Sequence, residues 1–303
     1  MDEKISNVQL YPGTQRVELN DKATKILFNL TAENYAAMIQ KNLNCGVVEK
    51  KNHKKHGKIK STFKIENENG YTQIVELSEF DRAVFGVCIS EYLAGNQYTT
   101  PAIILRALTG KVGKADEGVK LYPEQRTAIL QSIDKMMCTL FDPDVIDAFE
   151  KLNYDNGTAE KIVKAPLLPC KRVQKTINGQ KADVIYFTDE SPLLKIAQLK
   201  GQILRYDVSL LDVPKQNNTP LIITLKNYIL RRVMEIKKHK MTPTLTFDDI
   251  FKKARITDKP NVIKLRARGY IVEFFEHLQA KGEIKSFELT KKGNKFYSIF
   301  FTF

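Results

Sequence analysis

The amino-acid sequence predicts an α+β fold in which one unit, three helices followed by a β-hairpin, occurs twice. Two observations support this fold. Apolar residues recur at helical spacing in two sets of three segments, and alternating strand residues around a turn follow each set. The chain of 303 residues is also long enough for two domains that each bury a core of their own.

The region before the first set gives mixed signals. Residues 1–20 combine polar residues with a Pro-Gly turn, which is typical of a loosely held arm. Residues 26–30 (ILFNL) predict a short strand, and a helix is expected from Thr31 onward. Segments 61–66 and 71–77 flank the sequence Asn-Glu-Asn-Gly and predict a hairpin.

Start and stop residues delimit the helices of the first set. Ser78 with Asp81 is typical of a capping box, and Gly110 is a typical helix end. An Asn-Gly turn joins the two strands of the hairpin that follows. The expected elements are helices from 78, over 100–110 and from 122, and a hairpin at 171–187.

The second set begins near Ser191, and the polar segment 213–220 is its best candidate for a hinge. Thr246 with Asp249 is typical of a helix start, and Gly282 is typical of a helix end. The expected elements are a helix at 192–201, a strand at 202–207, helices at 220–239, from 246 and at 260–281, and a terminal hairpin around a Lys-Lys-Gly-Asn turn.

Three helices and a hairpin in this order are the elements of a winged helix. The sequence therefore predicts two winged-helix domains in tandem. The expected divisions are an N-terminal arm over 1–21, an N-terminal winged-helix-like domain over 22–190 and a C-terminal winged-helix domain over 191–303.

The positive charge is concentrated in the C-terminal domain. The net charge is +13, and residues 191–303 hold 22 Lys and Arg against 10 Asp and Glu, a surplus of 12. A surplus confined to one region indicates a surface that meets an anion, and we expect that anion to be duplex DNA. The surplus lies mainly at four places: the helix end 231–240, the short helix (Lys252, Lys253, Arg255), the following helix (Lys264, Arg266, Arg268) and the hairpin tip (Lys291, Lys292, Lys295).

Helix 260–281 is the expected recognition helix. Its apolar stripe, centred on Ala267, predicts a core-facing side. The opposite side consists of small and apolar residues with basic residues on both flanks, which suits a major groove, where arginine reads guanine edges and apolar atoms meet thymine methyl groups. A solvated basic face with a tolerated glycine is the alternative. This face comprises Leu265, Gly269 and Val272, flanked by Lys264, Arg266 and Arg268.

The hairpin tip is expected to act as a wing that contacts phosphates. Lysine binds phosphate whatever the base sequence, so Lys291, Lys292 and Lys295 would position the protein on DNA without selecting a site. The alternative is an ordinary turn that its lysines keep soluble.

Catalytic, metal and cofactor signatures are not found, so we expect a non-enzymatic protein without cofactor or metal. The Gly-Lys pairs of 110–118 lack the Ser or Thr of a phosphate loop. In the basic loop 50–60, His53 and His56 could bind a metal only with further ligands, which the nearby sequence lacks. A solvated loop or an auxiliary phosphate contact are the other readings of that loop. The four cysteines form no CxxC pair and are expected to be reduced.

The sequence also gives no indication of membrane targeting. No apolar run approaches the roughly 18 residues that a membrane span needs. The first residues, MDEKISNVQL, lack the basic start and apolar block of a signal peptide. Cytoplasmic residence is expected.

The order of segments in the C-terminal half is distinctive. SPLLKIAQLKGQI, a strand, LLDVP, LKNYILRRVMEIKK and FDDIFKKARI precede the basic helix and the hairpin. Residues 180–303 thereby resemble the plasmid-type theta replication initiators, which contain tandem winged helices. The resemblance implies that the third helix, with Lys264, Arg266 and Arg268, binds directly repeated DNA sites (iterons). It also implies secondary DNA contacts and dimerisation through the N-terminal domain, host replication proteins as partners, and no nuclease or ATPase site.

The expected function is sequence-specific binding of duplex DNA by a replication initiator of a plasmid or other mobile element. Three alternatives remain open at this point. They are a winged-helix transcriptional regulator, an enzyme domain over 22–190 with a DNA-binding C-terminal domain, and an RNA-binding protein.

Overall fold

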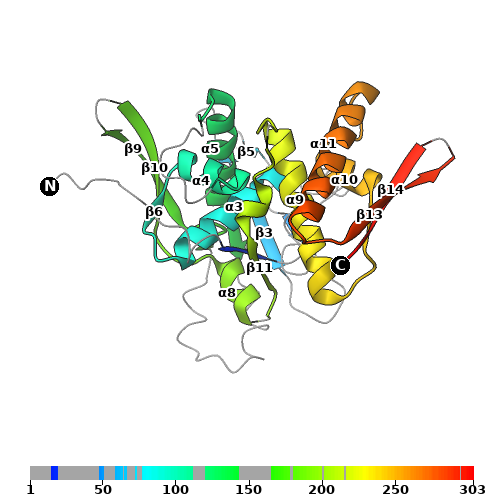
Figure 1. Cartoon of the computed structure of the whole chain (residues 1–303). Helices are drawn as coiled ribbons and strands as arrows, with labels where there is room; N and C mark the ends of the chain where they lie inside the picture. Colours follow the sequence, from blue (N-terminus) through cyan, green and yellow to red (C-terminus); the bar gives the residue numbers. More distant parts are fainter. Residues whose placement is uncertain are drawn as a thin grey trace.

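The computed structural model is a mixed α+β protein in which two helical modules lie side by side, each with a β-hairpin at its outer end (Figure 1). The α+β class is therefore confirmed. The structure describes residues 15–19, 48–50, 59–63, 65–66, 72–73, 77–111, 120–142, 165–177, 180–199, 201–214, 216–293 and 295–303.

The first module contains the predicted helices and hairpin, together with a short strand that the sequence did not indicate. The predicted helix ends are confirmed, because Ser78 and Asp81 form a capping box and Gly110 adopts φ +77°. The sheet has the order β6-β10-β9 and is antiparallel. The elements are α3 (Glu79–Leu93), β6 (Tyr98–Thr99), α4 (Pro101–Thr109), α5 (Pro123–Cys138), β9 (Cys170–Ile177) and β10 (Gln180–Phe187).

The second module repeats this order of elements. Its antiparallel sheet, β12-β14-β13, again places the last strand between the other two, as in the first module. Thr246 caps α10 through the backbone N–H of Asp249, as its sequence predicts. The elements are α9 (Pro220–His239), β12 (Thr244–Thr246), α10 (Phe247–Lys253), α11 (Asn261–Ala280), β13 (Ser286–Lys292) and β14 (Lys295–Thr302).

A separate small sheet is attached to the first module. Strands β2 (Val48–Lys50), β3 (Ile59–Phe63), β7 (Thr139–Asp142) and β8 (Ala165–Pro166) form it in the order β2-β3-β7-β8. Strands β4 (Ile65–Glu66) and β5 (Thr72–Gln73) pair with each other, which confirms the predicted hairpin in part. Residues 61–63, expected in its first strand, belong to β3 and pair with β7 instead. The expected strand at 26–30, the helix after it and residues 51–58 of the basic loop lie outside the described residues.

The expectation of a loosely held N-terminal arm is wrong for residues 15–19. These residues form strand β1 (Gln15–Leu19), which pairs antiparallel with β11 (Ile203–Asp207) along its whole length. Val17 and Leu19 are 1% exposed and belong to the core of the first module. The polar side chains that suggested an arm are buried instead, because Arg16 and Glu18 find partners inside the protein.

Each module has its own hydrophobic core. The first is built around α3, α4 and α5, and the second around α9, α10 and α11 with the inner face of the second hairpin. Leu193, Leu194 and Ala197 of helix α8 (Pro192–Leu199) lie in the first core. Although α8 follows Ser191, it therefore packs with the first module, and β11 continues from it toward the second.

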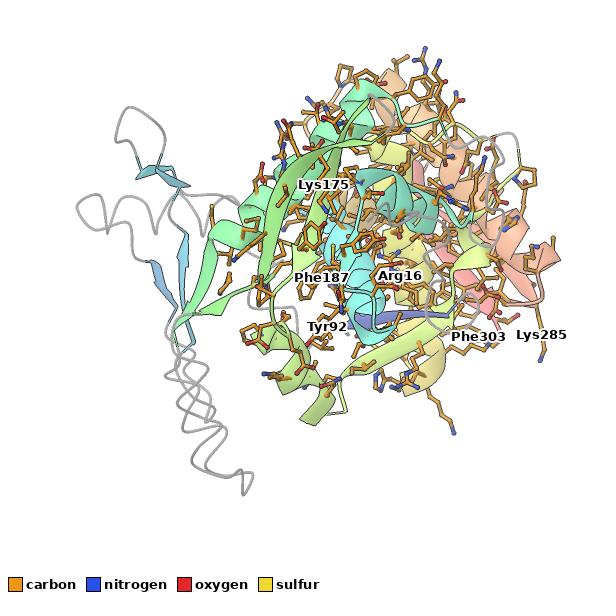
Figure 2. The ribbon with its side chains drawn as sticks, turned by 90° about the vertical axis from the view of Figure 1, so that its left-hand side faces the viewer. Arg16, Tyr92, Lys175, Phe187, Lys285 and Phe303 are labelled. Carbon is orange, nitrogen blue, oxygen red and sulfur yellow. The ribbon has the colours of Figure 1, made fainter. Side chains whose placement is uncertain are left out.

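A cluster of buried charged residues joins the two modules at the contact of α3 with α9. Arg16, which is labelled in Figure 2, belongs to this cluster. Its guanidinium donates to Asn227 of α9 at 2.5 Å and to the carbonyl oxygen of Ala83 in α3. Arg231 of α9 forms an ion pair with Glu79 of α3 at 3.0 Å. Removing charges from water is costly, so such a cluster is tolerated only where each charge has partners, as these have.

Two glycines allow the backbone to approach closely at this junction. A Cβ atom on Gly86 of α3 would lie 3.0 Å from Nη2 of Arg16. A Cβ on Gly110 would lie 2.5 Å from the backbone nitrogen of Asp212, just after the 3-10 turn Val208–Leu211. The two modules are therefore closely packed against each other at this contact.

Candidate nucleic-acid interface

Helix α11 presents the predicted core stripe to the second module. Ala267, Ile271, Phe274 and Leu278 are buried, as the predicted stripe requires, and Phe275 is buried beside them. The helix continues without interruption from Asn261 to Ala280, which confirms the predicted span.

The opposite side of α11 is open and partly apolar. Val262 is 57% exposed and Leu265 is 64% exposed. Gly269 is exposed, and a Cβ atom built on it would have no described atom within 4 Å. Val262 and Leu265 are three residues apart and so are neighbours on one face of the helix, where they form a small apolar patch. Contiguous apolar patches mark contact surfaces, so this side is the candidate for a contact.

The three predicted basic residues of α11 have different surroundings. Arg266 is exposed, and Lys264 is half-buried. The guanidinium of Arg268 lies over the rings of Phe247 and Phe251 of α10, 5.6 and 5.7 Å from their centroids. Its Nε is buried and has no hydrogen-bond partner in the described part of the chain. Arg266 is therefore accessible to a ligand, whereas Arg268 is held in place by the aromatic rings.

The tip of the second hairpin carries exposed lysines beside exposed aromatic residues. Lys291 and Lys292 are exposed, and each ammonium group lies over a ring of β14, those of Phe296 and Tyr297. Lys295 begins β14 and is the ladder partner of Lys292. The sequence did not indicate the exposed aromatic residues of this tip, because strand alternation alone does not show which strand residues face solvent.

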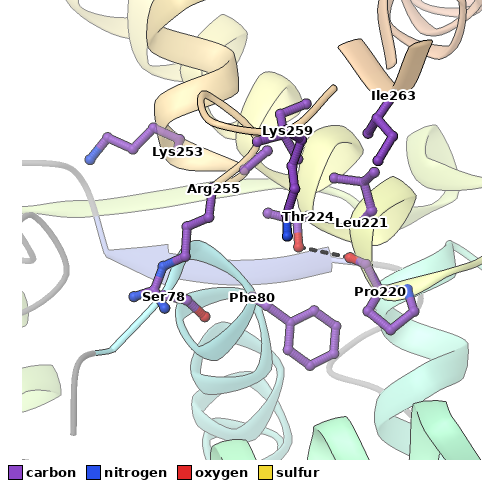
Figure 3. Close-up of a pocket in the computed structure, with 11 residues that line it drawn as sticks. Ser78, Phe80, Pro220, Leu221, Thr224, Lys253, Arg255, Lys259 and Ile263 are labelled. Atoms are coloured by element: carbon purple, nitrogen blue, oxygen red, sulfur yellow. Dashed lines mark hydrogen bonds between the residues drawn. The ribbon is translucent and has the colours of Figure 1, made fainter. Parts of the chain in front are cut away.

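The basic residues of α10 and the turn after it do not share one surface. Lys252 is exposed. Lys253 reaches the first module instead, where its ammonium lies 3.5 Å from a carboxylate oxygen of Glu79. Arg255 is exposed and adopts φ +56°, and its side chain extends toward Ser78 (Figure 3). The predicted DNA-binding set is thus divided between the outer face of α11 with the hairpin tip and the junction of the modules.

Part of the C-terminal charge surplus is not available on the surface. Arg231 is 1% exposed, within the buried cluster. Arg232 pairs with Glu235 at 2.5 Å, and Lys237 pairs with Glu283 at 3.1 Å. The expectation that the helix end 231–240 belongs to the anion-binding surface is therefore wrong for Arg231, because a sequence count of charge cannot distinguish a buried cation from an exposed one.

The matching surface of the first module is compensated by ion pairs. Arg126 of α5 pairs with Asp183 of β10, and Arg172 of β9 pairs with Asp134 of α5 at 2.8 Å. Lys135 pairs with Asp81 at 3.2 Å. The third helix of this module therefore has its cations already neutralised, in contrast to α11.

Burial shifts the pKa of several titratable groups in the first module. Burial raises the pKa of the Cys88 and Cys170 thiols, and both are free cysteines. Burial also raises the pKa of Glu91 to about 7. Cys45 lies outside the described residues.

Comparison with family models, with curated proteins and with solved structures gives no match for this chain. Over the described ranges, the helices lack the combination of length and apolar character that a membrane crossing requires. Within the same ranges, His, Cys, Asp and Glu residues do not gather in threes as a metal site would need.

Proposed function

We propose that this protein binds duplex DNA in a sequence-specific manner and acts as the replication initiator of a plasmid or other mobile element. In this proposal both modules are winged helices. Their shared element order and their shared strand order, first-third-second, support this assignment. The protein carries out no chemistry of its own and acts by binding DNA and partner proteins.

The observation that carries the proposal is the outer face of α11. Val262, Leu265 and Gly269 form an open, partly apolar strip, and Arg266 stands beside it. In a major groove, apolar side chains meet thymine methyl groups, and a guanidinium binds the two acceptors of guanine. Gly269 lets the helix backbone approach the bases closely. This close approach accounts for a glycine in a helix interior, where it costs about 1 kcal/mol relative to alanine.

The basic residues have separate roles in this proposal. Arg266 reads a base edge, and Arg268, held against Phe247 and Phe251, offers an already ordered guanidinium at the same groove. Lys264 and Lys252 contact phosphates on either side. Lys291, Lys292 and Lys295 contact phosphates as the wing and contribute affinity without sequence selection.

The junction of the modules suits two connected DNA-binding units. Strand β1, the pairing of Arg231 with Glu79 and the contact of α3 with α9 keep the modules in a defined arrangement. Figure 1 shows the two hairpins at opposite ends of the molecule with α5 and α11 between them. We assign to the first module, whose third helix is charge-compensated, the secondary DNA contacts and the dimer contact that the resemblance implies.

Selection from a random duplex pool with the full-length protein tests this function. We expect enrichment of one short motif, and we expect that motif as direct repeats beside the coding region, spaced by about two helical turns of roughly 10–10.5 base pairs. A DNA circle that carries these repeats should replicate only when the protein is supplied. If no motif is enriched in the pool, the protein does not bind DNA in a sequence-specific manner. If a motif is enriched but the DNA circle does not replicate, the protein is not a replication initiator.

A further inference from the structure

A pocket of about 400 Å³ lies between the two modules, and the DNA-binding proposal does not use it. It is bounded by the start of α3, the start of α9 and the turn that connects α10 to α11 (Figure 3). Its volume falls within the range of about 300–1,000 Å³ that is usual for ligand sites. The residues that line it are Ser78, Phe80, Pro220, Leu221, Thr224, Lys253, Ala254, Arg255, Ile256, Lys259 and Ile263.

The wall of this pocket is apolar. Phe80 is half-buried against the first core, and Leu221 and Ile263 are half-buried against the second. Pro220 lies beside them at the first turn of α9. Each module therefore contributes apolar side chains that are only partly covered, and the pocket offers them a common space.

The mouth of the pocket is positively charged. Lys253, Arg255 and Lys259 stand around it, and its described lining residues include no Asp or Glu. Glu79 offsets part of this charge through its contact with Lys253. Lys259 and Arg255 are both exposed. These cations and the apolar wall favour an occupant that carries negative charge at the mouth and apolar groups inside.

The backbone of the turn holds Arg255 in an unusual conformation. Its φ of +56° lies in the left-handed region, which a side chain other than Gly, Asn or Asp seldom adopts. Glycine would fit this turn without strain, but it would remove the cation. The presence of arginine here agrees with a role at the pocket mouth.

We propose that this pocket binds an acidic and apolar segment of a partner protein, with one or two large apolar side chains inside and flanking carboxylates on Lys259 and Arg255. Charge complementarity and the apolar wall favour a peptide over nucleic acid, since a phosphate gains nothing from the apolar wall and a peptide side chain does. Because both modules line the pocket, binding of the peptide would depend on how the two modules are arranged.

The test uses the full-length protein and a short fluorescent peptide in which Glu alternates with Leu and Phe. Two matched peptides replace either the Leu and Phe by Ser or the Glu by Lys. Fluorescence anisotropy should show binding of the first peptide and at least about tenfold weaker binding of each control, equivalent to about 1.4 kcal/mol. Equal binding of the Ser peptide would show a purely electrostatic contact and would overturn the proposal, as would no binding of any peptide.

Two variants locate the site, and one serves as a control. Lys259→Glu and Arg255→Gly should each weaken binding of the Glu-Leu-Phe peptide by about tenfold or more. Arg255→Gly should still fold cooperatively, because glycine suits the left-handed turn, and thermal unfolding checks this. Lys285→Glu, immediately before β13 (Figure 2), should bind the peptide as the unaltered protein does.

Photocrosslinking then separates the pocket from the DNA surface. A peptide with a photoreactive group in place of Phe should label residues within 78–80, 220–224 or 253–263. Labelling of the hairpin tip, or displacement of the peptide by duplex DNA together with loss of binding in Arg266→Ala, would mean that it occupies the DNA face, and the proposal would be wrong. Failure of sequence-specific DNA binding would leave these results unchanged, so the two proposals fail separately.

Discussion

Arg231 of α9 and Glu79 of α3 form a buried ion pair with 3.0 Å between Nη2 and Oε2, and this contact links the two modules. Glu18 of β1 and Glu235 of α9 each lie 3.9 Å from the same guanidinium. A single arginine therefore balances carboxylates from three elements of the chain.

We expect Arg231→Ala to lower the free energy of unfolding by about 3–5 kcal/mol, because the buried carboxylate of Glu79 would lose its closest described cation. The neighbouring Arg232 has a more exposed side chain and pairs mainly with Glu235, so Arg232→Ala should cost only about 1 kcal/mol or less. Chemical denaturation of both variants measures the difference. If Arg231→Ala loses no more free energy of unfolding than Arg232→Ala, the buried pair with Glu79 does not hold the modules together.

The two helical glycines Gly269 and Gly86 should respond oppositely to the same substitution. Gly269→Ala should raise the free energy of unfolding by about 0.5–1 kcal/mol, because the new methyl group meets open space and alanine favours the helix. Gly86→Ala should lower stability, because its Cβ would lie 3.0 Å from Nη2 of Arg16. Thermal unfolding tests both, and a stabilising Gly86→Ala would contradict the close packing of Arg16.

Larger groups at position 269 test the proposed DNA contact. Gly269→Glu should leave the fold intact and weaken binding to the selected DNA, because it places a bulky anion on the strip of Val262 and Leu265. If Gly269→Glu binds this DNA as tightly as the unaltered protein, the outer face of α11 is not the contact surface.

Glu91 should make stability depend on pH. Its carboxyl is fully buried, Asn96 donates to it at 2.7 Å, and burial raises its pKa from 4.5 to about 7. Between pH 4.5 and pH 7 the unfolded chain releases this proton while the folded protein keeps it, so stability falls as the pH rises through this range and stays low above it. Glu91→Gln should remove this dependence and stabilise the protein by about 1–3 kcal/mol at pH 8. If the unfolding midpoint of Glu91→Gln depends on pH as strongly as that of the unaltered protein, another group causes the effect.

The sequence was informative wherever a local signal determined the structure. The capping box of Ser78 and Asp81, the helix end at Gly110 and the start of α10 at Thr246 all depend on neighbours within a few residues. The core-facing stripe of α11 around Ala267 likewise follows from helical spacing alone.

The sequence could not show features that depend on distant partners. Strand β1 is stabilised by β11, which lies far along the chain. Arg16 can be buried because Asn227 accepts its hydrogen bond and Gly86 leaves room for its guanidinium. For the same reason charge counting placed Arg231 on the surface, and helical spacing did not reveal the rings of Phe247 and Phe251 beneath Arg268.

The wing should contribute affinity without specificity. Lys291→Ala combined with Lys292→Ala should weaken binding to selected and scrambled duplexes alike, because lysine contacts phosphates. The slope of log affinity against log salt should become shallower by about one unit per lost contact. A double variant that loses affinity only for the selected duplex would instead place these lysines at the bases.

Arg268 should differ from Arg266 in stability. Because its guanidinium stacks on Phe247 and Phe251, Arg268→Ala should lower the free energy of unfolding by about 0.5–2 kcal/mol. Arg266→Ala, at an exposed position, should change stability by no more than about 0.5 kcal/mol. Equal stability of the two variants would show that the rings do not hold Arg268.

The most direct measurement of the central claim compares Arg266→Ala with the unaltered protein on the selected duplex and on a scrambled duplex of equal length. We predict a loss of about 1–3 kcal/mol on the selected duplex and little change on the scrambled one, because only base-edge contacts distinguish the two. Equal losses on both duplexes, or no loss on either, would contradict the assignment of α11 as the helix that reads DNA.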